Sequence, residues 1–286
     1  MSTSGKSGAG SRAGAGGRSG AGARAGASGS RGNSGVWPTD VVVVGATSAI
    51  AEQCTRLWLE GGASTALLIG RSEEGLARIA ADLGVRFPAA VVTTSVVDLV
   101  SASSISATVE GFAGAGSAGA AAGAGLTVLV AHGAMTEQEV SQASLTAAAD
   151  VLTVTGVSPS LWIEACADTM TAGTIAVLGS VAGDRGRRKN YIYGAAKALI
   201  EAMTEGLQHR LVGSPLRVVL VKPGPTATPM TAALPQKGLA PVAAVAGEIV
   251  AGVNAGRPVV YAPLKWKLIM AVVRTIPAPL FNKLDF

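Results

Sequence analysis

Three side chains in the second half of the chain have the types and spacing needed for proton transfer at a carbonyl group. A short apolar run at Thr174–Leu178 predicts a buried strand, and Ser180 follows it directly. Tyr193 and Lys197 lie four residues apart in a segment that favours a helix. Residues four apart project from one face of a helix, one turn from each other. We therefore expect the serine to face the tyrosine and the lysine across a cleft.

This trio suits proton transfer coupled to hydride transfer. An unperturbed tyrosine hydroxyl has a pKa of about 10. A neighbouring ammonium favours the phenolate, so we expect Lys197 to lower the pKa of Tyr193 towards neutral pH. The Ser180 hydroxyl can hydrogen-bond the substrate oxygen and hold it beside the phenol. Tyrosine and lysine at this spacing also occur on many surface helices, and the preceding strand and serine favour the catalytic interpretation.

A second motif near the start of the chain suits phosphate binding. Val41–Val44 is an uninterrupted β-branched run, typical of a strand that is covered on both faces. The residues after it open a helix, whose free N–H groups and dipole suit a pyrophosphate. The predicted cofactor contacts in this turn are Gly45, Thr47, Ser48, Ala49 and Ile50.

Together these motifs resemble the short-chain dehydrogenase/reductase family, which pairs a glycine-rich turn after its first strand with a Ser, Tyr, Lys constellation. The resemblance runs from about Asp40 to the C-terminus. Strands and helices alternate regularly, which predicts an α/β fold: a Rossmann-like, doubly wound parallel sheet of about seven strands with helices on both faces. The family also implies an NAD(P)H-dependent ketoreductase and a homo-oligomer.

The chain departs from the family pattern at several positions. Ala49 and Ala51 stand where the family usually has glycine, and His132 lies in a segment where it usually has Asn-Asn-Ala-Gly. We expect His132 to be a structural residue that lines the cleft. Thr155 aligns with the asparagine that anchors a proton-relay water in the family, so it is the expected fourth catalytic residue.

The residue after the second predicted strand bears on cofactor choice. Arg71 follows Thr65–Ile69 at the point where NAD-preferring enzymes usually place an acid. A basic residue there favours a ribose 2′-phosphate, so NADP(H) is the favoured cofactor and NAD(H) the alternative. The resemblance implies that Asp98 holds the adenine amino group. The remaining cofactor contacts that it implies are Ala131, Gly133, Pro223, Gly224, Thr226 and Thr228, besides Tyr193 and Lys197.

Charge and composition limit the partners of the protein. Of the 286 residues, 49% are hydrophobic and 14% charged, which indicates a large buried core. The net charge of +5 comes from the first 35 residues, which hold no acid and five basic residues: Lys6, Arg12, Arg18, Arg24 and Arg31. The rest of the chain holds 18 basic and 18 acidic residues, so nucleic-acid binding by the folded part is not expected.

The chain divides into segments of different composition. We expect a disordered tail at residues 1–38, a catalytic domain at 39–262 with a low-complexity loop at 111–125, and an apolar and basic C-terminal extension at 263–286. Cys54 and Cys166 are interpreted as buried thiols of a reducing cytosol, with neither a disulfide nor a metal site. No apolar run is long enough to span a bilayer, and no secretory signal is recognised.

Two local features are similar to one subgroup of the family. The loop before Tyr193 and the C-terminal extension resemble the reductases that act on a 2-keto intermediate of decaprenylphosphoryl pentose in mycobacteria and their relatives. These work with a flavin-dependent oxidase in the synthesis of the precursor of cell-wall arabinan. The loop carries a basic cluster that suits a phosphodiester, Arg185, Arg187, Arg188 and Lys189.

This resemblance implies a lipid-linked keto substrate and a cytoplasmic protein in peripheral contact with the inner face of the membrane. The extension has the mixed apolar and basic composition of an interfacial segment, and docking on the protein's own body or on a second subunit is equally compatible. Two alternatives remain for function: reduction of a soluble ketone, and a catalytically silent nucleotide-binding protein.

Overall fold

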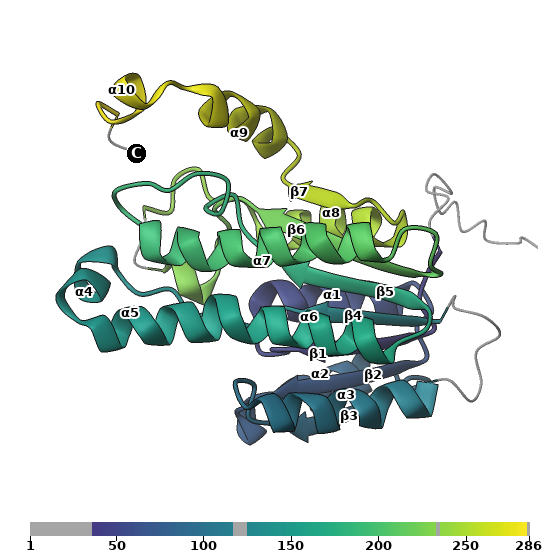
Figure 1. The fold of residues 1–286 in the computed structure, drawn as a ribbon. Coiled ribbons are helices and arrows are strands. Elements are labelled where there is room, and N and C mark those ends of the chain that lie inside the picture. The colour runs from purple at the N-terminus through teal and green to yellow at the C-terminus, as the bar shows by residue number, and fades with distance from the viewer. Residues whose placement is uncertain (1–35, 117–124, 233–234, 285–286) are drawn as a thin grey trace, which may run out of the picture. The chain divides into compact units, whose positions relative to one another are not determined.

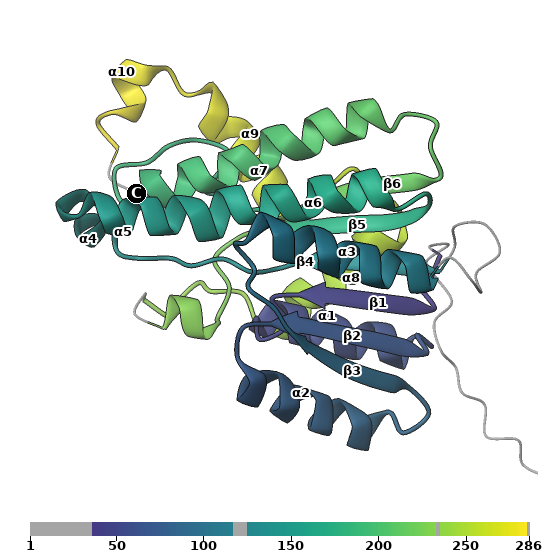
Figure 2. The ribbon, with the colours of Figure 1, turned by 60° about the horizontal axis from the view of Figure 1, so that its bottom comes forward.

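The computed structural model describes residues 36–116, 125–232 and 235–284. Seven strands in this part of the chain form one parallel sheet in the order β3-β2-β1-β4-β5-β6-β7 (Figure 2). The strands are β1 (Asp40–Val44), β2 (Thr65–Gly70), β3 (Val91–Val96), β4 (Leu126–Val130), β5 (Gly173–Leu178), β6 (Leu216–Pro223) and β7 (Val259–Ala262). Every residue of β5 is buried, as expected of a central strand covered on both faces.

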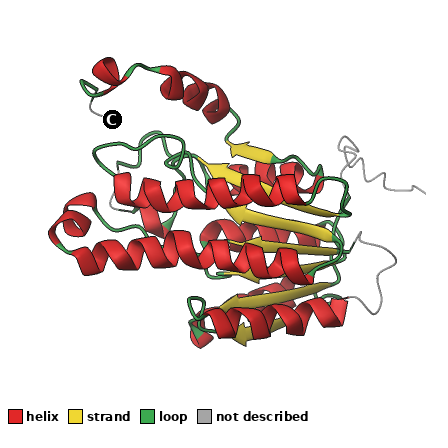
Figure 3. Cartoon of the chain, in the orientation of Figure 1, coloured by secondary structure: helices red, strands yellow, loops and turns green. Residues whose placement is uncertain are grey.

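Helices cover both faces of the sheet (Figures 1 and 3). One face packs against α1 (Ala49–Glu60), α2 (Glu73–Arg86) and α8 (Val242–Asn254). The other packs against α3 (Ala102–Gly116), α6 (Ser158–Thr169) and α7 (Tyr191–Arg210). The predicted Rossmann-like, doubly wound fold is confirmed. The remaining elements are α4 (Gln138–Ala143), α5 (Leu145–Leu152), the π-helical turn η1 (Thr153–Val157), the 3-10 turn η2 (Pro229–Thr231), α9 (Lys265–Thr275) and α10 (Ala278–Phe281).

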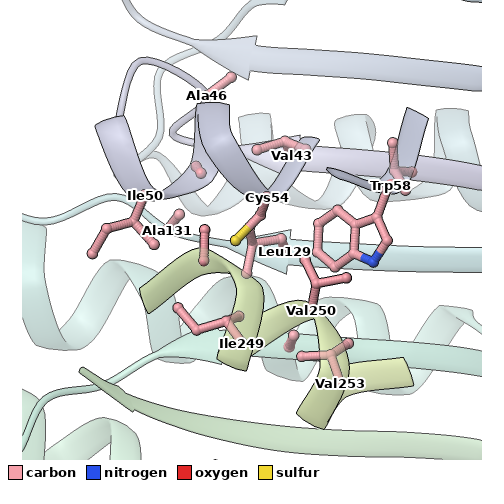
Figure 4. Packing of buried hydrophobic residues seen from close by; sticks show 14 of the residues in the cluster. Val43, Ala46, Ile50, Cys54, Trp58, Leu129, Ala131, Ile249, Val250 and Val253 are labelled. Carbon is pink, nitrogen blue, oxygen red and sulfur yellow. The ribbon is translucent and has the colours of Figure 1, made fainter. Parts of the chain in front are cut away.

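Alternate residues of one strand pack into the two hydrophobic cores on opposite faces of the sheet, and the core on the α1 and α8 side is an example. Val43 points into this core, while Val42 belongs to the core on the opposite face. Figure 4 shows Cys54 and Trp58 of α1 against Val250 and Val253 of α8. The Trp58 indole N–H donates a hydrogen bond of 3.0 Å to Asn254 Oδ1, which satisfies the buried polar atom of the ring. Cys54 and Cys166 are buried free thiols, as predicted.

Two predicted boundaries are wrong. The predicted loop at 111–125 begins later, because α3 continues to Gly116 and residues 117–124 lie outside the described part. Phe112 is buried in the core between α3 and the sheet, which extends the helix through this segment. Most of the predicted tail, residues 1–35, is likewise outside the described residues. Its last three residues already contact the body, since the Val36 N–H donates to Asn254 O at 3.1 Å.

The π-helical turn η1 lies between α5 and α6 and joins them directly. The C-terminal extension forms α9 and α10 and belongs to the same compact unit as the sheet, residues 33–286. Met270 is buried against that unit, whereas Leu268 and Val272 are 73% and 57% exposed. Within the described residues, no helix combines the length and apolar character needed to cross a membrane.

Candidate active site

A cavity of about 650 Å³ opens where the carboxyl ends of the central strands meet. Parallel α/β sheets bind their ligands at this edge, outside the point where strand order reverses. In this sheet the reversal lies between β1 and β4. The predicted site residues that line the cavity are Gly45, Thr47, Ser48, Ala49, Ile50, Arg71, Ala131, Gly133, Ser180, Tyr193, Lys197, Pro223, Gly224, Thr226 and Thr228. Asp98 and Thr155 are not among its lining residues.

Ser180, Tyr193 and Lys197 meet on one wall of this cavity. Ser180 follows β5, and the other two residues lie on the first turns of α7. Lys197 Nζ donates a hydrogen bond of 2.7 Å to Leu178 O and lies 5.8 Å from the centre of the Tyr193 ring. The Ser180 hydroxyl interacts with the Tyr193 phenol by a hydrogen bond. The three polar groups are therefore close enough to act on one substrate oxygen.

Two glycines hold the loop after Ser180 against α7. A Cβ on Gly194 would lie 2.9 Å from Ala182 O, and one on Gly183 would lie 3.0 Å from the backbone of Lys197. The first distance is shorter than real Cβ contacts show, and the second is at the tight limit. Glycine at both positions lets the loop approach the helix this closely. The close packing fixes the serine relative to the tyrosine and the lysine.

Burial sets the pKa of both titratable groups of the trio. It raises the pKa of Tyr193 to about 12, and the hydrogen bond from Ser180 opposes this rise. It lowers the pKa of Lys197 to about 7. The predicted shift of Tyr193 towards neutral pH is therefore wrong, because loss of water around the phenolate raises the pKa by more than the hydrogen bond from Ser180 lowers it. A phenol that stays protonated at neutral pH is the form that donates a proton to a carbonyl oxygen.

Thr155 supports the site from behind the cavity wall. Its buried hydroxyl donates to Ala134 O and accepts from the Ala134 N–H, both at 2.8 Å. Thr155 lies in the π-helical turn η1, and such turns are frequent at functional sites. We expected this hydroxyl to hold a relay water. Because Ala134 O takes the hydroxyl proton, Thr155 can bind a further group only through its second lone pair, as an acceptor.

His132 is a neutral histidine that lines the cavity, as predicted for a structural residue. Burial and the charges of Lys197 and Arg71 lower its pKa to about 3. Its Nε2 lies 2.7 Å from Ser158 Oγ, and that hydroxyl donates to Leu99 O at 2.5 Å. Ser158 must therefore accept from His132, which places the ring proton on Nε2. Nδ1 is then a bare acceptor, and it has no partner among the described residues.

The end of the cavity away from Ser180, Tyr193 and Lys197 fits the predicted dinucleotide. Ser48 precedes α1 without a side-chain bond to the first turn, which leaves the N–H groups of that turn available to a phosphate. The neighbouring Ala51 is fully buried in the core, so its methyl group packs away from the cavity. Arg71 is exposed at the rim. Asp98 is also exposed, and its carboxylate accepts from the Val100 N–H at 3.0 Å, so it lies beside the cavity.

Several lining residues were missed by sequence reasoning. Arg187 and Asn190 come from the loop between β5 and α7, and Met230 comes from η2. The sequence marked the loop only as a basic cluster and could not separate its members. Trp266 of the C-terminal extension was also missed. Its indole lies against Gly224, where an added Cβ would come within 2.0 Å of Trp266 Nε1.

Comparison with known proteins agrees with this geometry. Residues 39–238 match the family model of short chain dehydrogenases. An uncharacterized oxidoreductase of Streptomyces coelicolor is 38% identical over 39% of this chain and 45% of its own length. An uncharacterized oxidoreductase of Mycobacterium tuberculosis is 31% identical over 53% of this chain and 62% of its own length. The matched regions thus span about half of these relatives.

Solved structures share the fold at low sequence identity. A short chain dehydrogenase from Burkholderia cenocepacia in complex with NADP superposes with a TM-score of 0.73 at 19% identity, over 88% of this chain and 99% of that one. A short chain dehydrogenase/reductase from Burkholderia phymatum in complex with NAD gives 0.70 at 20% identity, over 84% and 93%. Since the family model matches residues 39–238, the chain belongs to the short-chain dehydrogenase family.

Proposed function

We propose that the protein is an NAD(P)H-dependent reductase of ketones. The observation that carries this proposal is the meeting of Ser180, Tyr193 and Lys197 on one wall of a cavity that also reaches the N-terminus of α1. When bound, the nicotinamide cofactor supplies hydride to the carbonyl carbon. Ser180 orients the carbonyl oxygen with a hydrogen bond, and Tyr193 donates the proton that the oxygen needs.

Lys197 assists this proton transfer from a fixed position. One of its N–H groups is used by Leu178 O, which leaves the others for the cofactor ribose and for proton exchange with Tyr193. A pKa of about 7 lets this group lose and regain a proton at neutral pH. Thr155 keeps the segment after β4 in place through its two hydrogen bonds to Ala134. Gly133 of that segment lies close to Lys197, since a Cβ there would be 3.6 Å from Lys197 Nζ.

NADP(H) is the proposed cofactor, with NAD(H) as the alternative. Arg71 lines the cavity after β2, where its guanidinium can pair with a ribose 2′-phosphate. His132 Nδ1 gives the same cavity a buried acceptor that a donor group of the cofactor would satisfy. The related structure from Burkholderia cenocepacia was solved with NADP and the one from Burkholderia phymatum with NAD.

The proposed substrate is the 2-keto group of a polyprenyl-phosphoryl pentose, in the synthesis of the cell-wall arabinan precursor. The resemblance of the loop before Tyr193 and of the C-terminal extension to that subgroup supports it. The extension also exposes large apolar side chains beside lysines and an arginine, which suits an isoprenoid chain or a membrane surface. A flavin-dependent oxidase as partner, assembly with further copies of the chain and a cytoplasmic location at the membrane follow from the same proposal.

The test follows nicotinamide absorbance in mixtures of the protein, NADPH or NADH, and a panel of ketones that includes the lipid-linked 2-keto pentose and soluble ketones. Tyr193→Phe should lower kcat by about 10²- to 10⁴-fold and keep the affinity for the cofactor. Tyr191→Phe is the matched control, because Tyr191 is 45% exposed on the same turn. Full turnover by Tyr193→Phe would disprove the assignment, and tyrosine-dependent oxidation with soluble ketones alone would disprove the lipid-linked substrate.

A further inference from the structure

The loop between β5 and α7 brings an unpaired guanidinium into the cavity. Arg187 lines the cavity on the same wall as Ser180 and Tyr193. Its Nε is buried without a hydrogen-bond partner, and in the described part of the chain it forms no ion pair. Burial lowers the pKa of Arg187, and the charge of Asp184 opposes this shift. Arg187 is partly buried, and its Nε is the atom that lacks a hydrogen-bond partner, so the guanidinium has donor capacity that an anion in the cavity can use.

Asp184 is already committed to other groups. Its Oδ1 accepts from Lys222 Nζ at 2.7 Å and from the Tyr261 hydroxyl at 3.2 Å. Its Oδ2 is buried without a partner. An alternative is therefore that Arg187 turns towards Asp184 and has a structural role. The test below separates these two roles.

The other arginines of the basic cluster have different roles. Arg185 donates to Val273 O and Ile276 O, both at 2.6 Å, and its guanidinium lies 3.7 Å from the centre of the Phe281 ring. It therefore fastens the C-terminal extension to the loop. Arg188 is exposed, and it is not among the residues that line the cavity. Of the three arginines, Arg187 is the one that faces the ligand.

A second polar group without a partner lies beside it. Asn190 lines the cavity, and its Oδ1 is buried without a hydrogen bond among the described residues. The two ends of an amide can exchange places, so Asn190 can present either a donor or an acceptor. A guanidinium offers two parallel N–H donors, and the amide adds a third. These donors suit the free oxygens of a phosphate ester, two in a diester and three in a monoester.

The position of this pair in the sheet separates it from the cofactor's ribose phosphate. Arg71 follows β2, whereas Arg187 and Asn190 follow β5. β1 and β4 lie between these strands. The pair thus belongs to the end of the cavity that holds the reacting oxygen.

We propose that Arg187, with Asn190, binds a phosphate group carried by the ketone substrate. This inference rests on the proposed ketone reductase function and adds to it the two residues that recognise the phosphate of the substrate. A charge-assisted hydrogen bond to the phosphate should be worth about 10- to 100-fold in affinity.

The test measures dissociation constants by calorimetry on the full chain saturated with NADP⁺. The probes are two matched pairs of ketones: dihydroxyacetone phosphate with dihydroxyacetone, and ribulose 5-phosphate with ribulose. The two pairs place the phosphate at different distances from the carbonyl. The native protein should bind a phosphorylated probe more tightly than its neutral partner, and Arg187→Gln should lose about 10- to 100-fold of this affinity with the neutral probes unchanged.

Arg188→Gln is the matched control and should keep the full preference for phosphate. Arg187→Lys keeps the charge without the planar fork and should retain part of the preference. Equal binding of phosphorylated and neutral probes by the native protein would overturn the proposal. Arg187→Gln could instead lower the melting temperature and lose affinity equally for phosphorylated and neutral probes. That result would overturn the proposal and show that Arg187 has a structural role as a partner of Asp184. Because the readout is binding, failure of the reductase function would appear separately, as absence of Tyr193-dependent cofactor oxidation.

Discussion

The two ends of the cavity differ in how their charged groups meet water. At the end formed by the loops after β2 and β3, Arg71 and Asp98 are exposed. At the end formed by the loops after β5 and β6, Lys197 is 4% exposed and Lys222 is 1% exposed. Solvent and salt screen the first group of charges, whereas the second group interacts through a medium of low dielectric.

We call the end formed by the loops after β2 and β3 the binding end, and the end formed by the loops after β5 and β6 the reacting end. Exposed side chains contribute small increments of affinity and leave the fold intact when they change. The buried charges hold the reacting end together. Lys222 forms ion pairs with Asp184, at 2.7 Å, and with Glu201 of α7, at 2.5 Å. Asp184 lies in the loop between β5 and α7 that also carries Ser180, called the serine loop below. Lys222 directly precedes Pro223 of the cavity wall, so the same ion pairs connect the serine loop, α7 and the turn after β6. Substitutions at the two ends should therefore differ in kind and in size.

The largest difference is expected when a buried charge is removed. Lys222→Met keeps the length of the side chain but leaves two carboxylates without their partner, and the side chains of Asp184 and Glu201 are only 0% and 16% exposed. The free energy of unfolding should fall by about 3–5 kcal/mol, as measured by chemical denaturation.

Arg86→Met, at the C-terminal end of α2, is the control for an exposed ion pair. Its ion pair with Asp82 is 2.9 Å long, but the two side chains are 55% and 37% exposed. Its loss should lower the free energy of unfolding far less than Lys222→Met does, because solvent screens an exposed ion pair. Similar losses for the two variants would show that burial does not determine the cost of losing an ion pair in this protein.

The fold could be predicted from the sequence because its signals are local. The predicted strands Val41–Val44, Thr65–Ile69 and Thr174–Leu178 agree with β1, β2 and β5 to within one residue. The extension of α3 to Gly116 was missed because glycine and alanine there carry no periodic pattern, while Phe112 is held by a contact with the sheet. The π-helical turn η1 has no local signal, since it depends on packing against α7.

The candidate site was predictable only where its motif is compact. Ser180, Tyr193 and Lys197 lie within 18 consecutive residues, so their types and spacing could be recognised. Arg185 and Arg187 could not be told apart, because the partner of Arg185 at Val273 is 88 residues away along the chain. The pKa of Tyr193 was predicted in the wrong direction for a similar reason. Burial is a property of the fold, whereas the neighbouring lysine is visible in the sequence.

The lysine of the reacting end should also make stability depend on pH. Burial lowers the pKa of Lys197 from 10.5 to about 7. Below pH 7 the group is charged in both states, and the folded state bears the full penalty of burying it. Between about pH 7 and pH 10 the unfolded state binds more protons than the folded state, so the free energy of unfolding rises with pH.

Lys197→Met removes this dependence. From about pH 6.5 to pH 9.5 the native protein should gain about 3 kcal/mol relative to the variant, as measured by denaturation at both pH values. The free energy of unfolding of the variant, relative to that of the native protein, should therefore be highest at the lower pH, where the native lysine is charged. Parallel pH profiles for the two proteins would mean that Lys197 keeps an ordinary pKa and that the reacting end is wetter than its burial indicates.

The smallest effect is expected at the binding end, where a substitution should alter the selectivity between NADPH and NADH without altering the fold. Arg71→Gln removes an exposed charge from the rim, so the affinity for NADPH should fall about 10-fold while that for NADH stays unchanged, as measured by cofactor fluorescence titration. Arg78→Gln, an exposed arginine of α2 that does not line the cavity, is the control. The loss should shrink as salt is added, since an exposed ion pair is screened. Equal losses of affinity for NADPH and NADH would mean that Arg71 contacts a group that both cofactors share. Arg71 would then not select between them.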